Sequence, residues 1–126
     1  MAATLPIYNS IQDQEPSKVY TCYRTTMAIN SKLEEMTEET NEIYQQIKET
    51  AATVTDDTPK DEVKRIKEEL QTLEEKASQL TYETILLFFP DFTAEDFQRL
   101  DPYDYQTFVE QIGAMRGKIF NRAQKN

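Results

Sequence analysis

The sequence predicts an all-α protein built on an antiparallel acidic helical hairpin, with further helices at its C-terminal end. Two long segments repeat apolar residues at alternating steps of three and four, which is helical spacing. Only two Gly occur in 126 residues, whereas barrels and sandwiches usually need Gly in their tight turns. Apolar residues make up 38% of the chain and the mean hydropathy is −0.73, so the core must be narrow, as packed helix pairs allow.

Charge and cysteine content narrow the class of protein. The chain carries 23 acidic and 14 basic residues, a net charge of −9, which repels nucleic acid and anionic membranes. The single cysteine, Cys22, excludes an internal disulfide and suits a reducing compartment. The N-terminal residues lack the basic and apolar regions of a signal peptide, and no apolar run approaches membrane-spanning length. We therefore expect a cytoplasmic protein that binds neither nucleic acid nor membrane.

Residues 1–24 differ from the rest of the chain. The only two runs that favour β-strands, residues 5–11 and 18–26, both start within them. The polar connection between these runs, residues 12–17, is able to close a short antiparallel hairpin. A two-stranded hairpin is marginally stable in water, so it must pack on another element or stay mobile. We interpret Cys22, in the second run, as a small buried hydrophobe rather than a reactive thiol.

The helical hairpin is predicted over residues 25–89. Its first helix covers residues 26–50, and its second begins at Pro59, after the N-cap hydroxyl of Thr58, and ends before Pro90. The turn chemistry of the residues between them favours antiparallel pairing of the two helices. Glu residues occupy the outer face of the first helix. The apolar stripes consist of Ile29, Leu33, Met36, Thr40, Ile43 and Ile47 in the first helix, and of Val63, Ile66, Leu70, Leu73, Ala77, Leu80, Thr84 and Leu87 in the second.

An aromatic segment, residues 86–109, follows the hairpin and holds five of the six Phe and two of the seven Tyr. It contains two helix starts: Thr93 with Asp96, and Asp101 before Pro102, each offer a side-chain acceptor and an acid at the positive end of a helix. The rings form either a core or a groove for a helical partner, and both interpretations stay open. The partner-binding residues predicted by the second interpretation are Phe88, Phe89, Phe92, Phe97, Tyr103, Tyr105 and Phe108.

The last helix begins at Asp101-Pro102 and ends in a basic segment, residues 116–126, with four bases and no acid. Cations suit a helix C-terminus. Its predicted apolar face consists of Tyr105, Phe108, Val109, Ile112, Met115 and Ile119. We expect a single domain over residues 1–126, comprising an extended element (1–24), the hairpin (25–89), and the aromatic corner with the C-terminal helices (90–126).

Most catalytic sites are excluded by composition. The chain has no His, so His-containing zinc sites and Ser–His–Asp triads cannot be built from it alone. The two glycines, Gly113 and Gly117, do not form a phosphate-binding loop. Neighbouring Glu residues on a helix are usually solvated surface charge. We therefore expect no enzymatic activity, no cofactor and no metal.

The C-terminal third resembles the tail assembly chaperones of long-tailed phages that infect Gram-positive bacteria. In that family a Phe-Thr pair, two further residues and an Asp commonly precede a last amphipathic helix, and Phe92, Thr93 and Asp96 match this start. A Leu-Asp step, matched by Leu100 and Asp101, follows it in the family. The run Lys18-Val19-Tyr20-Thr21, which enters an acidic helix, is similar as well.

The resemblance implies a non-enzymatic chaperone that binds the tape measure protein, keeps this long helical chain soluble and helps to recruit tail tube subunits in the host cytoplasm. An acidic helical protein with an aromatic groove suits the masking of apolar helical faces. Two alternatives stay open. In the first, the chain is a structural coiled-coil subunit or adaptor whose heptads pair with another copy. In the second, which is less favoured, it is an acidic regulator that mimics DNA.

Overall fold

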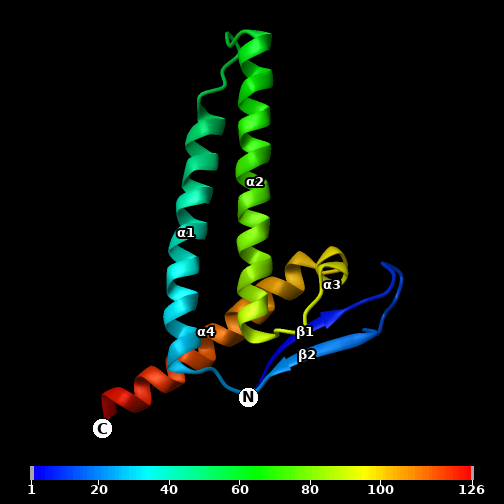
Figure 1. Cartoon of the computed structure of the whole chain (residues 1–126), viewed down its shortest axis with the longest axis vertical. Helices are drawn as coiled ribbons and strands as arrows, with labels where there is room; N and C mark the ends of the chain where they lie inside the picture. The colour runs from blue at the N-terminus through cyan, green and yellow to red at the C-terminus, as the bar shows by residue number, and fades with distance from the viewer. Residues whose placement is uncertain (1, 126) are drawn as a thin grey trace. The chain divides into compact units, whose positions relative to one another are not determined.

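The structure is a computed structural model that describes residues 2–125, with side chains described for residues 2–117. Within these residues the chain is mostly helical, with four helices and a small two-stranded antiparallel sheet (Figure 1). The helical character and the short N-terminal hairpin are as predicted. The elements in order are β1 (Ala3–Ile7), β2 (Lys18–Cys22), α1 (Met27–Ala52), α2 (Lys60–Phe88), α3 (Ala94–Gln98) and α4 (Pro102–Lys125).

The chain divides into two compact units. The first, which we call the sheet unit, comprises Met1–Ser31 and Ile85–Asn126, and it contains the sheet, α3 and α4. The second, the hairpin unit, comprises Lys32–Thr84, which is most of α1 and α2. The three predicted segments of the single domain, residues 1–24, 25–89 and 90–126, are consecutive in the chain, whereas the sheet unit combines residues from both ends of the chain. The N-terminal strands pack on the C-terminal helices through contacts between residues far apart in the sequence. Such long-range contacts leave no local pattern in the sequence from which they could be predicted.

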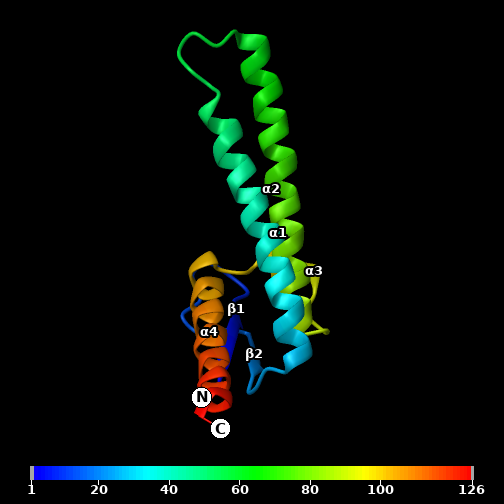
Figure 2. The same ribbon diagram turned by 90° about the vertical axis from the view of Figure 1, so that its left-hand side faces the viewer.

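In the hairpin unit, α1 and α2 run side by side in opposite directions, as Figures 1 and 2 show. The stripe residues Met36, Ile66, Leu73 and Ala77 are buried, and the other stripe members in this unit are buried or half-buried. The Glu residues between the stripe positions of α1 are exposed. The predicted helical periodicity of both segments is therefore confirmed.

Two threonines lie in these apolar stripes without leaving unpaired hydroxyls. The Thr40 hydroxyl donates to the Met36 carbonyl at 2.8 Å, and the Thr84 hydroxyl donates to the Leu80 carbonyl at 2.7 Å. A threonine inside a helix commonly bonds the carbonyl four residues back, so neither hydroxyl needs a partner on the opposite helix. The polar stripe positions therefore avoid the cost of a buried unsatisfied group.

The start of α2 differs in detail from the prediction. The hydroxyl of Thr58 accepts the Thr55 N–H at 2.8 Å and so serves the preceding turn, and α2 begins at Lys60. The Val63 N–H is bonded by the carbonyl of Pro59 at 3.0 Å, so the proline still leads into the helix. Asp61 and Glu62 lie in the first turn, where negative charge is favourable.

In the sheet unit, β1 and β2 pair antiparallel with Ala3 opposite Cys22 and Leu5 opposite Tyr20. One face of the sheet is the core face, with Ala3, Leu5 and Ile7 at most 1% exposed. Helix α4 lies against β1 (Figure 2), so the two-stranded β-hairpin packs on another element, as expected. Both strands are shorter than the predicted runs, because the chain turns away after Ile7 and leaves the ladder after Cys22.

Most of the predicted apolar face of α4 is confirmed. Phe108, Ile112 and Met115 are buried and Tyr105 is half-buried. Val109 was wrongly placed on this face, because it is 47% exposed. Ile119 and the basic residues after it lie outside the residues whose side chains the structure describes.

Candidate partner-binding site

The seven aromatic residues predicted to bind a partner occupy three different environments in the sheet unit. Phe89, Phe92 and Phe108 are buried, with 6%, 3% and 1% exposure; Phe88, Phe97 and Tyr105 are half-buried; and Tyr103 is 74% exposed. A ring that is buried in the folded unit cannot reach a partner while the unit stays folded. The structure therefore assigns the first three rings to the core, and partner binding by the other four stays a prediction.

Tyr20, which is not among the seven predicted residues, also belongs to this aromatic core. Its ring centroid lies 5.3 Å from that of Phe89 and 5.2 Å from that of Phe92. Phe108 of α4 contacts Phe89 at 5.6 Å and Phe88 at 5.5 Å between centroids. These tilted and edge-on pairs are the arrangements that aromatic rings prefer. The core thus continues from β2 through the end of α2 to α4.

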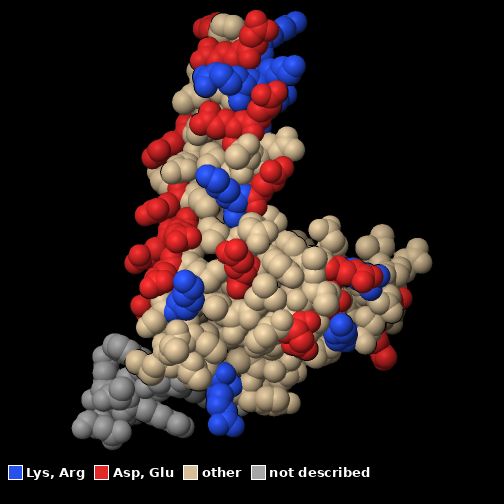
Figure 3. Space-filling model, viewed as in Figure 1, with Lys and Arg blue, Asp and Glu red and all other residues tan. Residues whose placement is uncertain are grey.

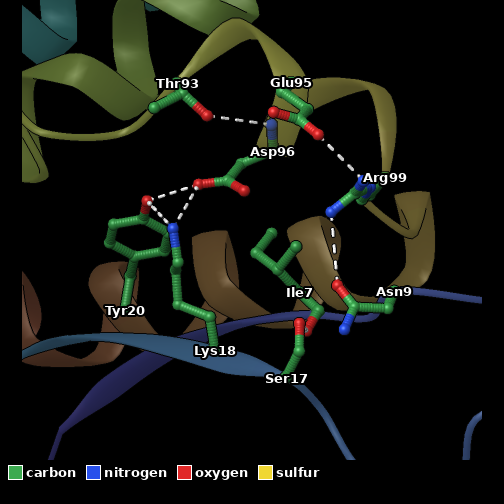
Figure 4. A network of polar contacts seen from close by, with 9 residues as sticks. All are labelled: Ile7, Asn9, Ser17, Lys18, Tyr20, Thr93, Glu95, Asp96 and Arg99. Atoms are coloured by element: carbon green, nitrogen blue, oxygen red, sulfur yellow. Dashed lines mark hydrogen bonds and ion pairs between the residues drawn. The ribbon is translucent and has the colours of Figure 1, made fainter.

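The hydroxyl of Tyr20 is bound by a buried carboxylate (Figure 4). Asp96 of α3 is 5% exposed and accepts hydrogen bonds from the Tyr20 hydroxyl at 2.5 Å and from the Lys18 ammonium at 3.1 Å. Lys18 and Tyr20 are two residues apart on β2, so their side chains leave the same face of the strand. A buried carboxylate is expensive unless it is paired, and here its partners tie α3 to β2.

The charges of this group are settled by its own contacts. Burial by itself raises the pKa of Asp96, but hydrogen bonds from Tyr20 and Lys18 outweigh it and hold that pKa below its usual value. The hydrogen bond to Asp96 raises the pKa of Lys18, and burial raises the pKa of Tyr20. At neutral pH the group is therefore a carboxylate, an ammonium and a neutral phenol. Since none of the three pKa values is moved toward 7, the group suits structure rather than acid–base catalysis.

The two predicted helix starts in the aromatic segment are confirmed. Thr93 is the N-cap of α3, and its hydroxyl accepts the Asp96 N–H at 3.0 Å. The Asp101 carboxylate accepts the Tyr103 N–H at 2.8 Å just ahead of α4. The carboxylate of Asp96 was expected only to favour the positive end of α3, and it turns inward to β2 as well.

A groove with a volume of about 620 Å³ opens in the sheet unit. Its lining comes from the loop after β1, residues 8–11, 13 and 14, and from the end of α3, the α3–α4 connection and the first turn of α4, residues 98–102 and 104. Arg99 lies between the two sides: its guanidinium donates to Asn9 at 3.2 Å and to Glu95 at 2.9 Å (Figure 4). The volume is in the range of ordinary ligand pockets. None of the seven predicted aromatic residues is among its lining.

The lining combines apolar and acidic side chains. Ile11 is fully exposed, at 104%, and Tyr8, Leu100 and Pro102 add apolar surface. Burial and the nearby charge of Asp101 raise the pKa of Asp104, which is half-buried in the same lining. Such a surface suits the apolar residues of an amphipathic helix that also carries bases.

Cys22 is buried and its thiol donates to the Arg24 carbonyl at 3.1 Å. Burial raises the pKa of this thiol and disfavours the reactive thiolate. It is the packing residue that the sequence predicted.

Within the described part of the chain, no group of three His, Cys, Asp or Glu side chains is placed to hold a metal ion. Over the same residues, the helices are too short or too polar to cross a bilayer. No known protein family, curated protein or solved structure matches this chain. The function must therefore be inferred from residues and geometry.

Proposed function

We propose that this protein is a non-enzymatic assembly chaperone of a long-tailed phage, which binds the tape measure protein and helps to recruit tail tube subunits. The observation that carries the proposal is the part of the chain from which the lining of the groove comes. Half of its lining comes from residues 98–102 and 104, which belong to the segment that resembles these chaperones. In this proposal, one side of an amphipathic client helix inserts into the groove.

Exposed apolar surface next to the groove supports the same proposal. Ile11 lies in the loop between the strands with its whole side chain in water, and Tyr103, one residue past the lining residue Pro102, is 74% exposed. Large exposed apolar residues near a concave surface are common features of partner-binding sites. Tyr103 is also the one predicted partner-binding residue with an open ring, and we retain it as a rim contact.

The hairpin unit would have a different task in this chaperone. Residues 32–84 carry 15 acidic and seven basic side chains, a net charge of −8. Figure 3 shows acidic side chains gathered over α1 and α2. A strongly charged surface opposes association between loaded complexes, which suits a protein that keeps an aggregation-prone chain in solution.

The alternative of a structural coiled-coil subunit is less favoured. Its heptad residues would have to pair with another copy, and in the hairpin unit Met36, Ile66, Leu73 and Ala77 are already buried within one chain. The solution mass of the purified chain separates the two functions. A stable elongated oligomer without any client would support the structural subunit, and a monomer or weak oligomer would support the chaperone. Binding to a basic nucleic-acid enzyme that salt abolishes would instead support the DNA mimic.

The chaperone proposal is tested first by sequencing the neighbouring genes, where we expect a long helical reading frame, and then by co-expressing its product, the expected client, with this chain. The chain should keep that client in the soluble fraction, and Ile11→Asp should weaken the complex tenfold or more, as expected for an anchor residue. Because Ile11 is fully exposed, this change should not lower folding stability. Val54→Asp is the matched control, since Val54 is an exposed aliphatic residue in the loop of the hairpin unit.

Two results would contradict the proposal. A client that stays soluble without this chain has no need of a chaperone. Equal losses of affinity with Ile11→Asp and Val54→Asp would mean that the groove is not the binding site.

A further inference from the structure

The two edges of the small sheet differ, and from this difference we infer a second binding surface: the outer edge of β2 binds an extended acidic segment of a partner protein as an added strand. Addition of a strand to an open sheet edge is a common mode of peptide recognition, in which main-chain hydrogen bonds supply affinity. This inference goes beyond the proposed function. Neither of its two central residues, Val19 and Thr21, lines the groove.

The direction of the main-chain groups follows from one hydrogen bond. The Thr4 N–H is bonded by the Gln111 side chain of α4 at 2.9 Å, so it points away from β2. Thr4 faces Thr21 in the register, and in an antiparallel ladder both members of such a pair point their N–H and C=O groups outward. The pattern repeats every second residue, so Val19, opposite Pro6, also points its main-chain groups away from β1.

The edge of β1 is closed. Gln111 occupies the N–H of Thr4, and Pro6, the next outward-facing residue, has no N–H to offer. Helix α4 also lies against this strand (Figure 2). An added strand would therefore find no free N–H donor at Thr4 or Pro6. A bound N–H, a proline and a covering helix are all means by which proteins protect sheet edges.

The edge of β2 has no such protection. Among the described residues, none donates or accepts a hydrogen bond at the outward main-chain groups of Val19 and Thr21. Val19 is 48% exposed, and neither proline nor a charged residue occupies positions 19–23. Tyr23, just past the strand, is 74% exposed and offers a ring to the side chains of an added strand. One edge of the sheet is therefore closed to an added strand and the other is open.

Charge selects the partner. Residues 16–31 of the sheet unit contain two bases, Lys18 and Arg24, and no acid, in a chain whose net charge is −9. Arg24 is exposed beside the strand end, and about half of the Lys18 side chain is accessible, although its ammonium is already paired with Asp96. A second copy adding its own β2 would bring two basic segments together, whereas acidic residues flanking an incoming strand would be attracted. The occupant is therefore an extended segment with Thr or Val at alternate positions and acids at its ends.

The test uses a synthetic acetylated hexapeptide, Glu-Val-Thr-Val-Thr-Glu, and amide hydrogen exchange of the full chain measured by NMR. At saturating peptide, exchange at Val19 and Thr21 should slow at least tenfold, while exchange at Thr4, already bonded to Gln111, should not change. Two control peptides, one with Lys at both ends and one N-methylated on the residues that face β2, should each bind at least tenfold more weakly. Equal binding by the N-methylated peptide would overturn the inference.

A pair of variants isolates the main-chain donor. Thr21→Pro removes an outward N–H and leaves the β1–β2 hydrogen bonds in place, since Thr21 is not in a hydrogen-bonded pair. It should abolish peptide protection at Val19, whereas Thr21→Ala should bind as the parent does. Should Thr21→Pro not fold, the N-methylated peptide decides alone. Protection of Val19 and Thr21 that rises with protein concentration in the absence of peptide would overturn the inference in favour of a second copy.

Discussion

The hairpin unit and the sheet unit form their cores in different ways. The buried residues of the hairpin unit recur every three or four positions, so each helix presents its stripe whatever the rest of the chain does. In the sheet unit, Tyr20 contacts Phe89 and bonds Asp96, and Thr4 is bonded by Gln111. The polar bonds among these contacts join residues 76 and 107 positions apart. Local periodicity thus produces the acidic scaffold, and long-range contacts produce the proposed binding surfaces.

The largest loss of stability should follow removal of the ring at the centre of the sheet unit. Phe108 is 1% exposed and contacts both Phe88 and Phe89, so Phe108→Ala should lower the free energy of unfolding by about 3–5 kcal/mol. Urea denaturation followed by far-UV circular dichroism measures this loss. The neighbouring change Val109→Ala, at a residue 47% exposed, is the control and should cost less than about 1 kcal/mol. Equal effects would mean that the helix register is wrong.

A smaller loss is expected in the hairpin unit. Leu73 is buried in a narrow stripe, at 9% exposure, and Leu73→Ala should cost about 2–3 kcal/mol. Thr72→Ala, at the exposed position beside it, is the matched control. We expect the folded Leu73→Ala protein to bind the client as the parent does, because binding is proposed for the sheet unit. A variant that folds normally and yet loses the client would place client binding on the hairpin unit.

The contrast between the units also explains how much the sequence could predict. Hydrophobic spacing located both long helices, and side-chain acceptors at Thr93 and Asp101 located the starts of α3 and α4. The sequence could not decide whether the Phe residues were core, because burial depends on Tyr20, which is distant in the chain. The inward turn of Asp96 was missed for the same reason.

The groove was missed because its two sides, around residues 8–14 and 98–104, are far apart in sequence. One local signal was present. Ile11 is a large apolar residue next to a polar turn, and such a residue is exposed unless the loop folds back on the core.

The buried ion pair predicts a dependence of stability on pH. The pKa of Asp96 is lower in the folded protein than its ordinary value of 3.8, so folding favours the ionised form. The stabilisation is therefore complete above about pH 5 and is lost as the pH falls through the folded pKa. Asp96→Asn should cost about 1–2 kcal/mol at pH 7, and this difference from the parent should shrink below pH 4. Urea titrations of both proteins between pH 3 and 7 measure it. A difference that is independent of pH would show that Asp96 acts only by packing.

The smallest effect is expected at the cap of α3. Thr93→Ala removes the acceptor of the Asp96 N–H and should cost about 1 kcal/mol. Thr93→Ser keeps the acceptor and should be close to neutral. Thermal unfolding of the two variants gives the comparison, and identical midpoints would mean that the cap adds nothing beyond the Tyr20–Asp96 contact.

We propose that partner binding belongs to the sheet unit and that the hairpin unit is a charged scaffold. The most direct test of this division is NMR chemical-shift mapping of the isotope-labelled chain titrated with an amphipathic helical segment of the client. We expect the largest amide shifts at the groove residues Ile11, Arg99 and Leu100, with little change at Tyr44 in the hairpin unit. Shifts confined to α1 and α2, with the groove unchanged, would contradict it.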